Sequence, residues 1–125
     1  MAELNKWMGI GNLCRDPELR YTPDGDAVCT FEIASNRVTG RAGEERKEDV
    51  LFIRIVAWKK LAEQCAEMLK KGRQVLVEGR LKENRWEDRK TGQKRSRIEC
   101  VAAQIQFLGG GHTPDERAPA EQSAG

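Results

Sequence analysis

Apolar and polar residues alternate along residues 74–108. Apolar residues or glycine recur at every second position from Val75 to Leu81, and β-branched residues return from Ile98 onward. A charged segment with a Lys90-Thr91-Gly92 turn separates the two runs. Because successive side chains along a strand point to opposite faces, the pattern predicts two long strands joined by a hairpin with a charged tip.

Cations and a tryptophan share one face of this predicted hairpin. Strand parity places Arg80, Lys82 and Trp86 opposite the aliphatic face. Eight cations against three acidic residues leave a local surplus of five positive charges between residues 80 and 97, in a chain whose net charge is +2. The cations are Arg80, Lys82, Arg85, Arg89, Lys90, Lys94, Arg95 and Arg97. An indole among solvated cations is a poor core residue and a good platform for a nucleobase.

A strand expected over residues 49–58 repeats this arrangement. Its aliphatic face carries Ile53 and Ile55, whereas Phe52, Arg54 and Trp58 lie on the opposite face. For either aromatic residue alone, core packing is as good an interpretation as exposure, because large aromatic side chains are usually buried. Two strands with the same arrangement favour the surface interpretation.

The first strand is expected over residues 4–13, where Gly9 and Gly11 permit a bend or a bulge. It is broken by Asp16-Pro17 and resumes over residues 18–21.

The second strand is expected to begin near Ala27, after a turn signal in Thr22-Pro23-Asp24-Gly25. Residues 37–48 follow it with two glycines and seven charges, which predict an exposed loop. Composition alone fits a solvated loop and a nucleic-acid-binding finger equally well.

Residues 59–71 carry the one convincing helical pattern, and Gly72 is placed to supply a left-handed stop. Lys70 and Lys71 suit the negative end of the helix dipole. The apolar stripe is expected to plug the end of a barrel and consists of Leu61, Ala62, Cys65, Met68 and Leu69.

Composition excludes several classes of protein. The longest apolar runs are far too short for a membrane span, and the N-terminal residues lack an apolar signal core, so we expect a cytoplasmic protein with no membrane contact. Four widely spaced cysteines and a single histidine, His112, argue against a zinc site, so the sequence predicts no cofactor and mostly buried, reduced thiols.

The domain organisation follows from length and from the tail. A chain of 125 residues suits one domain. We expect this domain to occupy residues 1–109. Residues 110–125 lack core-forming side chains and are expected to be a disordered C-terminal tail.

The order of these elements predicts the fold. Three strands, a helix and two strands suit an all-β protein with one helix, specifically a five-stranded Greek-key barrel of the oligonucleotide-binding (OB) type with long hairpin arms.

Several motifs in sequence order resemble the bacterial single-stranded DNA-binding protein (SSB) family over about residues 4–110. They are Gly11-Asn12-Leu13, Arg15-Asp16-Pro17-Glu18-Leu19-Arg20-Tyr21, Lys60-Leu61-Ala62-Glu63, Lys71-Gly72, Val77-Glu78-Gly79-Arg80-Leu81, Trp86 and Gln106-Phe107-Leu108-Gly109. The resemblance implies an OB barrel, a homotetramer, and binding of single-stranded DNA without sequence preference in replication, recombination and repair.

The resemblance also implies a set of binding residues. Phe52 and Trp86 stand where the family stacks tryptophans on bases, and Trp58 stands where it often uses phenylalanine. Together with cations from the hairpin, the expected DNA-binding residues are Phe52, Arg54, Trp58, Lys60, Lys71, Arg80, Lys82, Arg85, Trp86 and Arg97.

The chain departs from the family pattern at some positions. Thr39 stands at a common aromatic position, Ile53 replaces a histidine near subunit contacts, and Trp7 replaces an aliphatic residue. We expect subunits to pair through the first-strand edge that contains Trp7. The tail lacks an acidic tip that ends in phenylalanine, so tail-dependent recruitment of repair enzymes is expected to be weak or absent.

Two other functions compete with this interpretation. One is a metal-dependent hydrolase on an OB barrel, but its possible ligands are loop carboxylates without a histidine partner: Asp24, Asp26, Glu44, Glu45 and Glu48. The other is a dimeric replication-restart (primosomal) OB-fold interaction module. The sequence favours a binding protein over an enzyme.

Overall fold

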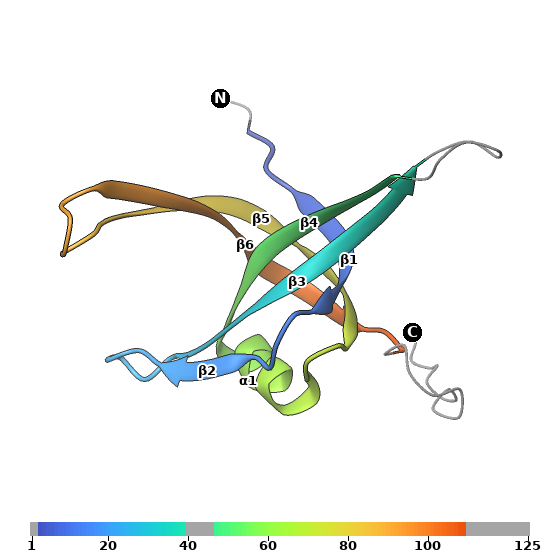
Figure 1. The fold of residues 1–125 in the computed structure, drawn as a ribbon. Helices are drawn as coiled ribbons and strands as arrows, with labels where there is room; N and C mark the ends of the chain where they lie inside the picture. Colours follow the sequence, from blue (N-terminus) through green and yellow to red (C-terminus); the bar gives the residue numbers. More distant parts are fainter. Residues whose placement is uncertain (1–2, 40–46, 110–125) are drawn as a thin grey trace.

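Six strands and one helix make up the described part of the chain, which is residues 3–39 and 47–109 of the computed structural model (Figure 1). In chain order they are β1 (Trp7–Leu13), β2 (Glu18–Tyr21), β3 (Ala27–Thr39), β4 (Lys47–Trp58), α1 (Lys59–Met68), β5 (Gln74–Glu87) and β6 (Lys94–Phe107). The tail predicted over residues 110–125 and the loop residues 40–46 lie outside the described residues.

The strands close into a five-stranded barrel, which confirms the predicted OB fold. β1 pairs with β5 on one side and reaches β3 on the other, where Asn12 opposes Ala34 and Leu13 opposes Ile33. β4 and β6 pair in parallel, and the other pairs are antiparallel. β2 pairs with β3 beyond the end of β1, so the predicted break and resumption of the first strand are confirmed.

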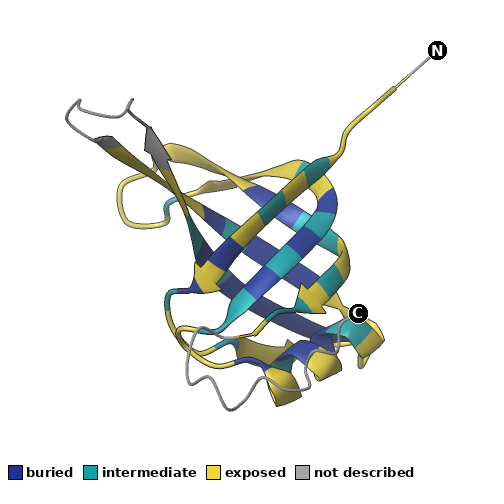
Figure 2. Ribbon diagram, turned by 90° about the vertical axis from the view of Figure 1, so that its right-hand side faces the viewer, coloured by how far each residue is buried: buried dark blue, intermediate teal, exposed yellow. Residues whose placement is uncertain are grey.

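Inward-facing side chains fill the barrel. Alternate residues of the strands are buried, as the checkered band of dark blue in Figure 2 shows. The largest fully buried side chains are aliphatic residues and cysteines: Cys29, Ile33, Ile55, Cys65, Val75, Val77 and Cys100. This packing confirms the predicted aliphatic faces of the two central strand patterns.

Helix α1 covers one end of the barrel with Ala62 and Cys65, both buried. The prediction that it continues to Lys71 was wrong, because Leu69 is already extended. Tertiary hydrogen bonds replace the missing helical ones: the Lys71 N–H donates to Asp16 Oδ1 over 2.9 Å, and the Gly72 N–H donates to the Leu13 carbonyl over 2.8 Å.

Several predicted features near α1 and in the loops are also corrected. Met68 is exposed and does not plug the barrel. Gly72 has the positive φ that was predicted, but it lies in the turn after the helix and not directly at the helix end. The loop predicted over residues 37–48 is shorter, because β3 runs to Thr39 and β4 begins at Lys47.

The N-terminal strand also starts later than predicted, at Trp7. Before it, the Asn5 side chain takes over the pairing with β5. Its amide donates to the Leu81 carbonyl over 2.8 Å and its oxygen accepts from the Leu81 N–H over 2.9 Å.

Glycines make room for close neighbours where we expected a bend or bulge in β1. The Trp7 indole lies over Gly9, where a Cβ would collide with the ring. The bulge occurs instead in the β5–β6 ladder at Glu78 and Gly79. A Cβ at position 79 would collide with the Val101 carbonyl oxygen.

Lys59, at the junction of β4 and α1, has a φ of 60° and is the one non-glycine residue with positive φ among residues 3–39 and 47–109. We expect Lys59→Gly to raise the free energy of unfolding by about 1 kcal/mol, since glycine avoids the steric cost of the left-handed conformation. Urea denaturation measures the change. Lys60→Gly is the matched control and should lower stability by about 1 kcal/mol. A loss of stability in both variants would contradict the strain argument.

Burial raises the pKa values of the core thiols, to about 11 for Cys29 and about 12 for Cys65, where the nearby Cys29 adds to the effect. Because thiolates then form more readily in the unfolded chain, stability should fall as the pH rises above about 9, the ordinary thiol range. Urea unfolding at pH 8 and pH 10.5 tests this. Cys65→Ala should show a smaller fall than the unmodified protein, and an equal fall would contradict the assignment to Cys65.

Candidate nucleic-acid interface

The registers of β4, β6 and β5 place aromatic and cationic residues on one outer face of the sheet. Arg54 opposes Glu99, which opposes Lys82, and Val56 opposes Val101, which opposes Arg80. Directly opposed residues share a face, and every second residue along each strand lies on that same face. We call this surface the outer face, and its predicted site residues are Phe52, Arg54, Trp58, Arg80, Lys82, Trp86 and Arg97.

The three aromatic residues of the outer face are exposed. Phe52 is 60% exposed, Trp58 is 42% and Trp86 is 41%. Core packing, the alternative that sequence left open for Phe52 and Trp58, is therefore excluded. Exposed aromatic rings that share one face of a domain indicate an interaction surface.

Arg97 contacts Trp86 across the β5–β6 hairpin. Its guanidinium carbon lies 5.5 Å from the centroid of the indole, within the range of a cation–π interaction. The contact orients the ring while much of it stays accessible.

Arg54 and Glu99 form an ion pair in the middle of the outer face. Arg54 Nε lies 3.1 Å from Glu99 Oε2, without the alignment of a hydrogen bond. Sequence parity identified Arg54 but not this partner, because β4 and β6 are far apart in the chain and pair only through the barrel.

Three other predicted site residues do not lie on the outer face. Lys60 is in the first turn of α1, and Lys71 is in the turn after it. Arg85 points to the opposite face of the hairpin arm, where its Nη2 donates to Glu83 Oε1 over 2.8 Å. This hydrogen bond raises the pKa of Arg85 and lowers the pKa of Glu83, and the opposite charges add to both effects.

Two cations of the outer face were not in the predicted set. Arg20 of β2 opposes Val28 of β3, and Val28 in turn opposes Trp58 of β4. Arg95 opposes Trp86 directly. Parity in residues 94–101 could have found Arg95, whereas the four residues of β2 are too few for a pattern to reveal Arg20.

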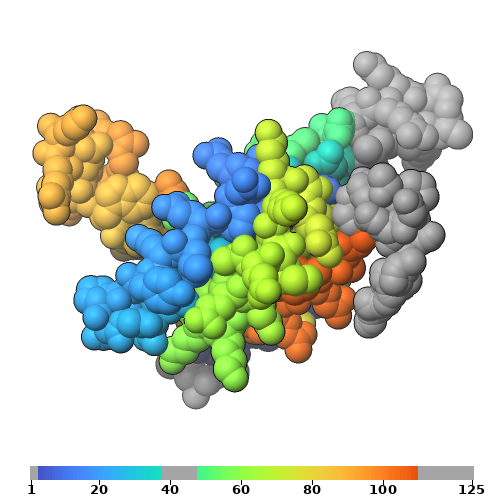
Figure 3. All heavy atoms as spheres, turned by 90° about the horizontal axis from the view of Figure 1, so that it is seen from below, coloured from blue at the N-terminus to red at the C-terminus, as the bar shows by residue number. Residues whose placement is uncertain are grey.

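Two hairpins project from the barrel on either side of the outer face. The β5–β6 arm and the β2–β3 hairpin extend to the same side of the barrel in Figure 1, and Figure 3 shows them as separate lobes from below. The sheet between them runs from β2 across β3, β4 and β6 to β5. The outer face therefore offers a continuous surface from Arg20 to Trp86.

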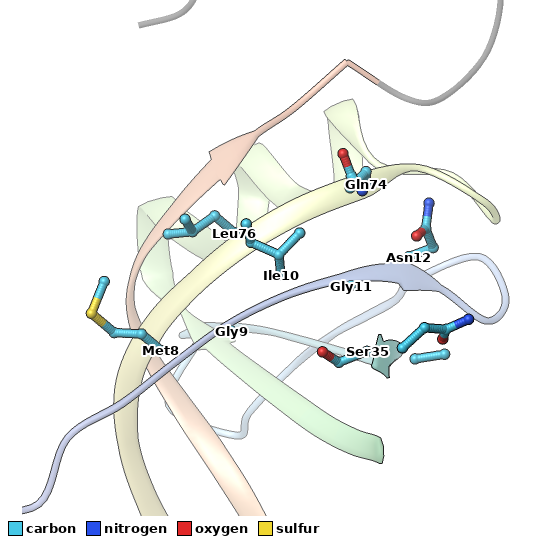
Figure 4. Close-up of a pocket in the computed structure, with 10 residues that line it drawn as sticks. Met8, Gly9, Ile10, Gly11, Asn12, Ser35, Gln74 and Leu76 are labelled. Atoms are coloured by element: carbon cyan, nitrogen blue, oxygen red, sulfur yellow. The ribbon is translucent and has the colours of Figure 1, made fainter. Parts of the chain in front are cut away.

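A second surface lies along β1, which flanks β5 on the side opposite to β6. A shallow hollow of about 560 Å³ includes Met8, Ile10 and Leu76 in its lining (Figure 4). The edge of β1 from Trp7 to Gly11 is unpaired on the β3 side, because β3 reaches only Asn12 and Leu13.

Trp7 itself is not the apolar group that this edge exposes. Its indole is partly buried against the core and Gly9, whereas Met8 and Ile10 are exposed. We expected subunits to pair through the first-strand edge that contains Trp7. Alternation along β1 instead turns the Trp7 side chain toward the core.

The described part of the chain holds neither a metal-ligand cluster nor a membrane-spanning helix. Among residues 3–39 and 47–109, no group of three or more acidic, cysteine or histidine side chains is arranged to hold a metal ion. Glu44 and Glu45, two possible ligands of the rival hydrolase, lie outside this part of the chain. None of the described helices has the length and apolar character needed to cross a membrane.

The sequence profile of the Single-strand binding protein family matches residues 4–108. A Single-stranded DNA-binding protein 1 of Chlorobaculum tepidum is 45% identical over 116 residues, covering 90% of this chain and 72% of that protein. A Single-stranded DNA-binding protein of Thermotoga maritima is 43% identical over 121 residues, covering 97% of this chain and 80% of that protein.

A solved structure agrees with these relatives. The chain is similar to a Plasmodium falciparum SSB complex with ssDNA, with a TM-score of 0.79 and 29% identity over 87% of this chain and 98% of that one. Fold, profile and relatives agree, and the chain belongs to the Single-strand binding protein family.

Proposed function

We propose that the protein binds single-stranded DNA by stacking bases on Phe52, Trp58 and Trp86. One observation carries the proposal: three exposed aromatic rings share a continuous outer face with cations. The names of the relatives and the DNA in the similar solved complex support the same ligand.

Stacking explains both the preference for single strands and the lack of sequence preference. Every base has a π-face, and each base stacked on an aromatic side chain contributes about 1–3 kcal/mol whatever its identity. Duplex DNA keeps these faces covered. Some of the cations of the site neutralise phosphates, so the logarithm of the affinity should fall with the logarithm of the salt concentration at a slope of about −0.7 per phosphate neutralised.

The cellular role follows from this binding mode. The protein coats and protects exposed single strands in replication, recombination and repair, in a cytoplasmic, nucleoid-associated setting. It catalyses no reaction in this proposal. Incubation of DNA with the protein and divalent metal tests the last point, and cleavage that depends on the protein would overturn it.

Competition binding tests the function itself. Oligo-dT with a fluorescent label is bound to the protein, and its anisotropy is followed as unlabelled DNA is added. A mixed-sequence single strand should displace it, while a duplex of equal length should not. Equal displacement by duplex would reject the proposal.

We also propose a homotetramer in which β1 contributes a contact edge. The unpaired edge, the hollow beside it and the exposed Met8 and Ile10 support this assembly, because an open edge with apolar residues favours pairing with another copy. A dimer on native mass spectrometry would instead favour the replication-restart module.

Ile10→Glu should shift the native mass to smaller species, since it places a charge in the proposed contact. Met68→Glu is the matched control, because Ile10 and Met68 are both 46% exposed and Met68 lies on α1. Unchanged mass in both variants would exclude Ile10 from the contact, and a monomeric wild type would exclude the assembly.

A further inference from the structure

Four charged residues form a row across the middle of the outer face. Glu32 of β3 opposes Arg54 of β4, Arg54 opposes Glu99 of β6, and Glu99 opposes Lys82 of β5. The signs alternate along the row. Two acidic and two basic side chains leave it with no net charge.

The inner pair of this row is closely packed. Arg54 Nε lies 3.1 Å from Glu99 Oε2, and the two side chains keep 34% and 10% of their surface exposed. Glu99 is the one charged residue that is buried in the described part of the chain. A phosphate at Arg54 would therefore sit beside a carboxylate that already offsets the guanidinium charge and repels another anion.

Among the described residues, two cations toward the margins of the outer face have no ion-paired carboxylate that offsets their charge. Arg80 is exposed and opposes the apolar Val101, and no ion pair holds it within the described residues. Arg97 opposes the neutral Asn84. These cations keep their full charge for a phosphate.

We propose that the row Glu32–Arg54–Glu99–Lys82 receives nucleobases, and that phosphates follow the cations at the margins. This inference rests on the proposed function and deepens it. The exposed part of Arg54 donates hydrogen bonds to a base or lies flat against it. Phe52, two residues earlier on the same face of β4, stacks on the neighbouring base. Glu99 is a positioning residue that holds Arg54 and keeps phosphates away.

The first test is the salt dependence of oligo-dT binding by the full chain. Glu99→Gln frees the charge of Arg54, so binding should tighten at low salt and the salt slope should steepen by about 0.7, one extra phosphate. Glu67→Gln removes the same charge from the exposed side of α1 and should leave the slope unchanged. An unchanged slope in Glu99→Gln would overturn the inference.

The second test separates bases from phosphates with a charge-neutral pair of substitutions. The double variant Arg54→Gln, Glu99→Gln leaves no buried carboxylate without a partner. It should bind oligo-dT about tenfold more weakly than wild type, the cost of hydrogen bonds from a charged donor. Its salt slope and its affinity for an oligomer of abasic tetrahydrofuran units should be unchanged.

Arg80→Gln is the contrasting variant, because it removes a cation proposed to contact phosphate. Its salt slope should be about 0.7 shallower, and its affinity should fall equally for oligo-dT and for the abasic oligomer. Thermal unfolding checks that each variant is folded. If the double variant also loses slope and abasic affinity, Arg54 contacts phosphate and the inference is wrong. If wild type fails to bind oligo-dT at all, the proposed function fails instead.

Discussion

The double variant Phe52→Ala, Trp86→Ala is expected to weaken oligo-dT binding by about 2–6 kcal/mol, the sum of two base–aromatic stacks. Both rings are exposed on the outer face, one on β4 and one on the β5 arm. Their removal takes away two stacking platforms and leaves the core untouched. The thermal unfolding midpoint should therefore stay close to that of wild type.

Ile98→Ala is the control for this variant. Ile98 is 59% exposed, as Phe52 is 60% exposed, but Ile98 opposes Glu83 on the other face of the arm. Its truncation should leave oligo-dT affinity unchanged. If the double variant keeps its affinity and melts at a lower temperature, the two rings are structural and the stacking account fails.

Gly79→Ala is expected to lower the free energy of unfolding by about 3 kcal/mol, at the upper end of the range for overpacking. The added Cβ would collide with the carbonyl oxygen of Val101 at the bulge in the β5–β6 ladder. This neighbour is backbone, so no rotamer change can relieve the clash. The ladder that carries Arg80, Lys82 and Trp86 would have to shift.

Gly109→Ala is the matched control, since no atom lies within 4 Å of a Cβ built there. Its stability should stay within about 0.5 kcal/mol of wild type. Urea unfolding of both variants makes the comparison. Equal stability of Gly79→Ala and Gly109→Ala would show that the ladder yields easily at the bulge.

Strand parity predicted much of the outer face because the relevant strands are long and half-buried. Alternation along β4 and β5 separates Ile53, Ile55, Val75 and Val77, which fill the barrel, from the residues of the outer face. The same regularity indicated the hairpin and the core. These features depend on local pattern, which a sequence records directly.

Parity was less informative where the β5–β6 arm leaves the barrel. Residues on both of its faces are exposed there, Arg85 and Ile98 as well as Trp86 and Arg97. Alternation still separates the faces, but neither is marked by burial. The resemblance placed Arg85 in the site, and the register places it on the face opposite to that of Trp86.

Contacts between distant segments could not be predicted. The Arg54–Glu99 pair depends on the parallel pairing of β4 with β6. The end of α1 depends on hydrogen bonds that the N–H groups of the following turn donate to Asp16 and Leu13. Local propensity favours a longer helix, but the tertiary hydrogen bonds of the turn end the helix at Met68. The inward turn of Trp7 likewise needs the space above Gly9.

A titration of intrinsic tryptophan fluorescence with oligo-dT, and in parallel with duplex DNA of equal length, tests the central claim most directly. Trp58 and Trp86 are exposed on the outer face, and Trp7 is packed against the core. Stacking predicts strong quenching by oligo-dT and little by duplex. The absolute loss of fluorescence intensity should be the same in Trp7→Phe as in wild type. Binding of oligo-dT without quenching, or equal quenching by duplex, would contradict base stacking on the outer face.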